Sequence, residues 1–299
     1  MVNPNRDQII KIVVPLCIVA VFLAFLFLKP GFFKAGTKLS PDDSRKLNEE
    51  AKSDIADGKY EDALKPLLRL NRAYPDNHIY LQQLAEAYAH LNQPREEAGY
   101  WEKYIDHSPN PLVGCPALPR AYEKLGDSHE KEIIAAYERC LALDPTNTDS
   151  IFFLAHYLEN AGQPDRAAEL YQKGITLSPN YADLRLGLAR IWFRQDKVAE
   201  AKQATEAVLT KNPNYLDALL LMGMMYYKED NYAKAKEYLL RGTKISDTYV
   251  DFHVQLARIA DDQKDYAEEM RQYSRLVELR PNEARYRNKL TSLIAAQKK

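Results

Sequence analysis

Apolar residues follow two patterns along the chain, one continuous and one periodic. The continuous run covers residues 12–28, which contain no charged side chain. Elsewhere apolar residues recur three and four positions apart, as in Ile151, Leu154, Ala155 and Leu158. That spacing places them on one face of a helix. The two patterns predict one apolar helix near the start of the chain and a series of amphipathic helices after it.

A proline recurs near the end of most of the predicted helix pairs. The steps between these prolines are 34, 36, 34, 34 and 68 residues, from Pro75 through Pro109, Pro145, Pro179 and Pro213 to Pro281. A fixed period between about 20 and 50 residues means that the chain repeats one small unit. The unit is clearest in residues 148–181, where Gly162 lies in a tight turn and Pro164 begins the second helix.

Small residues also recur in register with the prolines. In most units the first helix has one at a fixed place: Ala51, Ala85, Ala155, Ala189, Gly223 and Ala257. Several second helices have another: Ala63, Ala167, Ala201 and Ala235. Small side chains allow two antiparallel helices to approach closely. Together these residues resemble the tetratricopeptide repeat, a helix–turn–helix unit of about 34 residues.

The resemblance covers seven units: 44–77, 78–111, 112–147, 148–181, 182–215, 216–249 and 250–283. It implies an all-α, right-handed superhelical solenoid whose first helices line a concave surface. It also implies that the chain binds protein or peptide partners and is not an enzyme. Residues 284–299 are expected to form a capping helix on the exposed face of the last unit.

Residues 12–28 are predicted to form a transmembrane helix between a tail, residues 1–11, and a linker, residues 29–43. A run of this length makes a helix of about 26 Å, close to the thickness of bilayer hydrocarbon. A cleaved signal peptide is the alternative, but the residues after Leu28 offer a poor cleavage site. Basic residues on both sides leave the orientation undecided. The short tail favours export of the repeat region, with a cytoplasmic orientation as the other choice.

The third unit departs most from the pattern. Pro119 occupies the place of the small residue, and the first helix is expected to begin only near residues 116–119. Cys115 and Cys140 are expected to be neighbours, because antiparallel pairing brings the start of the first helix near the end of the second. They are a candidate disulfide if the region is exported. Alternatively, Cys140 is a small buried residue.

Two further positions break the pattern. Pro66 lies inside the second helix of the first unit, where a proline costs about 3 kcal/mol or kinks the helix. Asp247 replaces the proline of the sixth unit and is expected only to loosen that turn.

Residues on the predicted concave face form the candidate binding site: Phe152, Leu186, Arg190, Phe193, Leu220, Met224, Tyr227 and Arg258. Apolar and aromatic side chains mixed with arginine suit a groove for an extended segment or a helix. The alternative is that they fill contacts between adjacent first helices. Aspartates also recur in the first turns of first helices: Asp149, Asp183, Asp217 and Asp251. They suit either a basic ligand or the helix dipole.

Composition narrows the function further. The 299 residues are 46% hydrophobic and 28% charged, with a net charge of −1. The overall electrostatic field of the chain therefore does not favour binding to nucleic acid. The three cysteines and six histidines have no spacing that suits a metal, and no catalytic motif occurs. We therefore expect no cofactor and no small-molecule substrate. The sequence predicts a membrane-anchored scaffold that organises a protein complex, or else a cleaved, soluble binding protein of the same kind.

Overall fold

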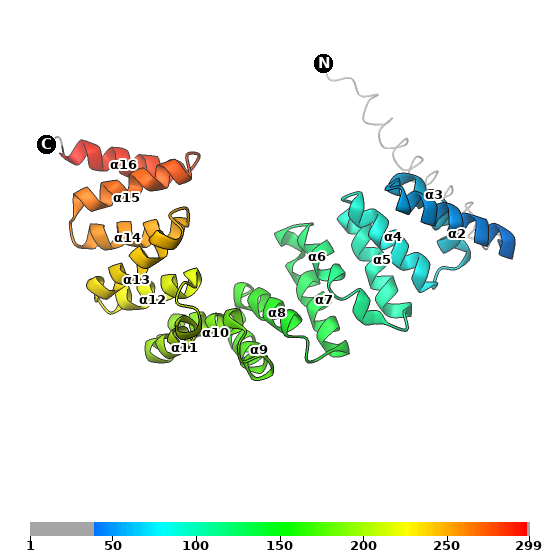
Figure 1. The fold of residues 1–299 in the computed structure, drawn as a ribbon, viewed down its shortest axis with the longest axis horizontal. Helices are drawn as coiled ribbons and strands as arrows, with labels where there is room; N and C mark the ends of the chain where they lie inside the picture. Colours follow the sequence, from blue (N-terminus) through cyan, green and yellow to red (C-terminus); the bar gives the residue numbers. More distant parts are fainter. Residues whose placement is uncertain (1–38, 298–299) are drawn as a thin grey trace, which may run out of the picture. The chain divides into compact units, whose positions relative to one another are not determined.

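The computed structural model describes residues 39–297 (Figure 1). All regular structure in that range is helical. The α-helices are α2 (Pro41–Ala56), α3 (Tyr60–Ala73), α4 (His78–His90), α5 (Pro94–His107), α6 (Ala117–Glu123), α7 (Glu130–Leu143), α8 (Thr148–Asn160), α9 (Pro164–Leu177), α10 (Ala182–Arg194), α11 (Val198–Lys211), α12 (Leu216–Lys228), α13 (Tyr232–Ile245), α14 (Val250–Asp262), α15 (Tyr266–Leu279) and α16 (Ala284–Gln297). The short 3-10 helices η1 (Pro111–Val113) and η2 (Asp127–His129) flank α6. The prediction of an all-α chain of repeated helices is confirmed for this range.

The predicted transmembrane helix, residues 12–28, lies outside the described residues, as do the tail before it and most of the linker. Between residues 39 and 297, no helix has both the length and the apolar character needed to cross a bilayer.

The chain divides into two compact units after Ala121, inside α6. In the first, α2 packs on α3, α3 on α4 and α4 on α5. In the second, each helix from α7 to α16 packs on the next one along the chain. Successive first helices of the second unit, α8, α10, α12 and α14, also contact each other. These contacts place them on the inner side of that unit's curve, with α9, α11 and α13 outside (Figure 1).

The turn between the two helices of each repeat contains a residue with positive φ. These residues are Gly58, Asn92, Gly126, Gly162, Asp196, Asp230 and Lys264, and each step is 34 residues except one of 36. A left-handed residue reverses the chain directly after a helix, which glycine does without strain. The backbone therefore repeats in the register that the prolines predicted, including the one longer step.

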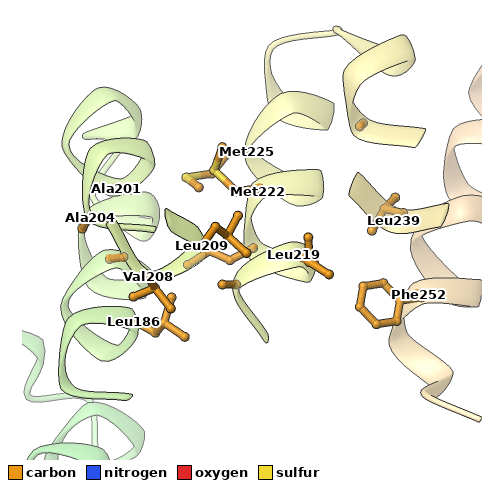
Figure 2. Close-up of a cluster of buried hydrophobic side chains, with 14 of the residues drawn as sticks. Leu186, Ala201, Ala204, Val208, Leu209, Leu219, Met222, Met225, Leu239 and Phe252 are labelled. Atoms are coloured by element: carbon orange, nitrogen blue, oxygen red, sulfur yellow. The ribbon is translucent and has the colours of Figure 1, made fainter. Parts of the chain in front are cut away.

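The core of the second unit runs without interruption from one repeat to the next. One cluster of buried residues extends from α10 to α14, and Figure 2 labels Leu209 of α11 and Met222 of α12 among its members. Leu239 of α13 and Phe252 of α14 belong to the same cluster. Each repeat thus completes the core of its neighbour, as expected for a stack of units that cannot bury their apolar faces alone.

Two glycines of the second unit allow an aromatic ring to touch the backbone of a helix. A Cβ atom at Gly187 of α10 would lie 2.3 Å from the ring of Tyr171 on α9. At Gly242 of α13 it would lie 2.1 Å from the ring of Phe252. Both rings are fully buried. Glycine is required here by the close approach of ring and helix, since these backbones are ordinary α-helix.

The third repeat has the irregular start that the sequence predicts. Its first helix, α6, begins at Ala117 and contains only seven residues. Pro66, by contrast, does not interrupt α3, which continues from Tyr60 to Ala73 with the proline ring buried.

The expectation that Asp247 only loosens its turn is wrong. Its carboxylate lies 2.6 Å from the guanidinium of Arg275 on α15. Its backbone carbonyl accepts a hydrogen bond of 2.9 Å from the ring of His253, which is buried on α14. The other ring nitrogen of His253 lies 2.8 Å from Oε1 of Gln272. Asp247 therefore connects its turn to both helices of the following repeat.

The last helix, α16, packs against α15 and buries Tyr286 and Leu293. The ammonium group of Lys289 lies 2.9 Å from the carboxylate of Glu269, which is completely buried on α15. Because a buried carboxylate is costly without a partner, this ion pair favours the docked position of α16.

Candidate partner-binding groove

The predicted site residues lie on the four first helices of the second unit. Phe152 is on α8, and Arg258 is on α14. The others are on α10 (Leu186, Arg190 and Phe193) and on α12 (Leu220, Met224 and Tyr227). These helices form the inner side of the unit's curve, so the eight residues share one face (Figure 1).

Five of the eight surround one depression between α10 and α12, which we call the groove. It has a volume of about 380 Å³ and is lined by Leu186, Arg190, Phe193, Arg194, Asp217, Leu220, Leu221, Met224 and Tyr249. Leu186 and Leu221 are buried, whereas the side chains of Phe193, Leu220 and Met224 are half-buried. An apolar surface of this kind, left partly open to solvent, can accept apolar side chains of another molecule.

The other three predicted residues do not line the groove. The ring of Phe152 stacks on that of Tyr181, with centroids 5.7 Å apart. The guanidinium of Arg258 lies 4.6 Å from the ring centroid of Tyr227. The hydroxyl of Tyr227 donates to Asp262 at 2.5 Å. These side chains make contacts within and between repeats, which was the alternative interpretation of the pattern.

A buried carboxylate organises the arginines at one end of the groove. The side chain of Glu159 on α8 is only 2% exposed and lies 3.2 Å from Arg190 and 2.8 Å from Arg194. It also accepts a hydrogen bond of 3.1 Å from the hydroxyl of Tyr171. Burial, reinforced by the charge of Arg190, lowers the pKa of nearby His156. Since ordinary histidine titrates near pH 6.5, His156 is neutral at pH 7.

At the other end, the recurring aspartates accept hydrogen bonds from tyrosines. Tyr181 donates to Asp149 at 3.2 Å, and Tyr215 donates in the same way to Asp183. Tyr249 donates to Asp217, one repeat further along. Burial, followed by the charge of Asp149, raises the pKa of Tyr181 to about 12. Each of these tyrosines is the residue just before the next first helix, so the aspartates connect successive first helices, a role beyond the two that the sequence suggested.

The sequence interpretation missed four residues of the groove: Arg194, Leu221, Asp217 and Tyr249. A signal was present for some of them. Arg194 and Lys228 are 34 residues apart and are both cationic, and the tyrosines at 181, 215 and 249 follow the same period. The hydrogen bond between Tyr249 and Asp217 joins residues 32 positions apart, at the two ends of one repeat, so it becomes visible only in the folded chain.

Outside the groove, the side chains to consider are those that could bind a metal ion and the two cysteines of the described residues. Within residues 39–297, the structure contains no group of three or more histidine, cysteine, aspartate or glutamate side chains placed to hold a metal ion. Cys115 and Cys140 are buried, and each is disulfide-bonded. That they are bonded to each other stays a prediction.

Sequence comparison identifies the repeated unit. One sequence model described as a tetratricopeptide repeat matches residues 158–220, and another with the same description matches residues 216–249. Residues 158–249 of the chain therefore match tetratricopeptide repeats. The two matches together include α10, α12 and all nine residues that line the groove. No curated protein sequence matches the chain.

Solved structures share the fold, among them tetratricopeptide repeat proteins. One from Parabacteroides merdae is 13% identical with a TM-score of 0.60, covering 85% of this chain and 99% of that one. PilW, a type IV pilus biogenesis factor, is 14% identical with a TM-score of 0.58, covering 71% of this chain and 98% of PilW. YrrB, which has a peptide-binding site, is 19% identical with a TM-score of 0.51, covering 62% of this chain and 95% of YrrB. At these identities the likeness concerns the fold alone.

Tetratricopeptide repeats form scaffolds that bind proteins or peptides and are generally not enzymes. The matched repeats, residues 158–249, are therefore of the kind that forms protein-interaction scaffolds.

Proposed function

We propose that the chain is a membrane-anchored scaffold that binds a segment of a partner protein in the groove between α10 and α12. The observation that supports this most directly is the apolar lining, in which Phe193, Leu220 and Met224 are only half-buried. Apolar side chains that remain partly exposed gain free energy when a partner covers them, about 25 cal/mol per Å² of apolar area.

Residues 12–28 are the proposed membrane anchor, and the repeat region is proposed to lie on the exported side. Confinement to a bilayer raises the effective concentration of other membrane-associated proteins. A groove of modest affinity would then suffice to organise a complex at the membrane. A cleaved, soluble form with the same binding role is the alternative.

The groove is tested by photo-crosslinking in intact membranes. A photoreactive phenylalanine analogue replaces Met224 in the full chain. In a matched control it replaces Leu240, which is exposed on α13, outside the groove. We expect a discrete protein adduct from position 224 and none from position 240, with loss of the adduct when Phe193→Gln is added. Equal labelling from the two positions would contradict the assignment of the groove.

The anchor is tested by fusing reporters to Lys299, the last residue of the chain. We expect a periplasmic alkaline phosphatase fusion to be active and to stay with membranes after washing in carbonate. Activity only from a cytoplasmic reporter would reverse the proposed orientation. Recovery of the repeat region in the soluble fraction, with a mature N-terminus beyond residue 28, would favour the cleaved form.

A further inference from the structure

The groove has opposite charges at its two ends. Asp217 lies in the first turn of α12 and accepts a hydrogen bond from the neutral hydroxyl of Tyr249, which does not neutralise its charge. That charge also acts on Arg190 of α10. Arg194 is the last residue of α10, and it shares the single carboxylate of Glu159 with Arg190. Two guanidinium groups on one carboxylate leave one positive charge in excess.

These charged groups are accessible beside the apolar lining. The side chain of Arg194 is 62% exposed, and Asp217 is also exposed. Lys228, the last residue of α12, adds a second cation at the basic end, where it lies 5.2 Å from the ring centroid of Phe193. Lys228 also pairs with Asp196 at 2.6 Å, whereas Arg194 shares the carboxylate of Glu159 with Arg190, so the charge of Arg194 is the less compensated of the two.

The distance between the two ends limits what can bind. Asp217 and Lys228 are the second and last residues of the 13-residue helix α12. At about 1.5 Å per residue the two ends are roughly 16 Å apart. An extended segment covers that distance in about five steps of roughly 3.3 Å, which is about six or seven residues when both ends are counted. A helix, about 10 Å in diameter, does not enter a depression between two helices that are themselves in contact.

Resting on the proposed function, we infer that the groove binds an extended partner segment with a basic residue at the Asp217 end, apolar residues in the middle and an acidic residue at the Arg194 end. Alternate side chains of an extended segment point to the same face. The apolar residues of the partner would therefore alternate with polar ones and cover Leu220 and Met224.

The test uses three labelled peptides with blocked ends and the full chain in mild detergent. The first is Lys-Ser-Leu-Ser-Leu-Ser-Glu, the second has Glu at both ends, and the third has Lys at both ends. We expect the first to bind about three-fold more tightly than either of the others at low ionic strength, because each matched end adds a weak exposed ion pair. The preference should vanish at about 0.5 M salt, where such pairs are screened.

Two substitutions test which end of the groove recognises the basic residue of the peptide and which end recognises the acidic one. Asp217→Asn should remove the preference for Lys and keep the preference for Glu, whereas Arg194→Gln should do the reverse. The matched controls are Asp251→Asn, at the equivalent position of α14, and Lys197→Gln, just beyond α10; both should bind as the unaltered chain does. Equal binding of the three peptides, or binding of none, overturns the inference. A cross-link from Met224 would in that case leave the proposed function standing.

Discussion

Glu159 is a buried carboxylate whose charge is balanced by two arginines from the next repeat. We predict that Glu159→Gln lowers the free energy of unfolding by about 3 kcal/mol, because breaking a buried ion pair leaves a charge without its partner. Urea denaturation followed by circular dichroism measures this. Glu169→Gln, an exposed position on α9, is the control. A loss no larger than that of the control would mean that solvent reaches the arginines and replaces the carboxylate.

The hydrogen bond between Tyr181 and Asp149 gives stability that depends on pH. The pKa of Tyr181 is raised to about 12 in the folded chain. Unfolded tyrosine titrates near pH 10, so this stability is complete below pH 10 and is lost as the pH rises towards 12. We predict that Tyr181→Phe costs about 1 kcal/mol at pH 8, and that the difference from the unaltered chain shrinks at pH 11.

Urea denaturation at the two pH values measures that difference. Tyr266→Phe is the control, since Tyr266 is exposed and stands at the start of α15. A difference between Tyr181→Phe and the unaltered chain that stays constant from pH 8 to pH 11 would contradict the assigned cause.

At the scale of the helix pair, close approach between α9 and α10 depends on Gly187. We predict that Gly187→Ala costs about 1–3 kcal/mol, because the new methyl group would overlap the buried ring of Tyr171. Gly99→Ala is the matched control in α5, where the added Cβ meets no atom within 4 Å beyond its chain neighbours and the backbone of its own helix. There we expect a gain of about 0.5–1 kcal/mol from the higher helix propensity of alanine. In thermal unfolding experiments we expect the midpoint to fall for Gly187→Ala and to rise for Gly99→Ala.

The turn between the helices of the last repeat contains a strained residue. Lys264 has φ 58°, which costs a residue with a Cβ atom about 1 kcal/mol relative to glycine. We predict that Lys264→Gly raises the midpoint of urea denaturation. Lys173→Gly, in the interior of α9, should lower it by a similar free energy, because glycine is a poor helix former. An unchanged or lower midpoint for Lys264→Gly would show that the lysine side chain stabilises the turn.

Helix pairs could be predicted from the sequence because their signals are local. A proline, a turn glycine and small residues at fixed spacing each act within one repeat, as Gly162 and Pro164 do. Contacts between repeats were harder to predict. The network of Asp247, His253 and Arg275 joins residues up to 28 positions apart, and its only local sign was a missing proline. Four of the nine residues that line the groove were also missed, among them Tyr249, whose contact with Asp217 joins residues 32 positions apart.

At the scale of the whole molecule, the last prediction concerns which cysteines are bonded to each other. Of the three cysteines, Cys17 lies outside the described residues, whereas Cys115 and Cys140 are disulfide-bonded. We predict that they are bonded to each other in the exported chain, because oxidising compartments preserve disulfides. Peptide mapping by mass spectrometry without reductant should yield one linked pair of peptides, which separates after reduction. Cys115→Ser should release Cys140 as a free thiol and lower the midpoint of thermal unfolding, since a lost cross-link typically costs about 2–4 kcal/mol. A disulfide from either residue to Cys17 would contradict the pairing. Free thiols at both Cys115 and Cys140 in purified membranes would also contradict it, and they would count against export of the repeat region.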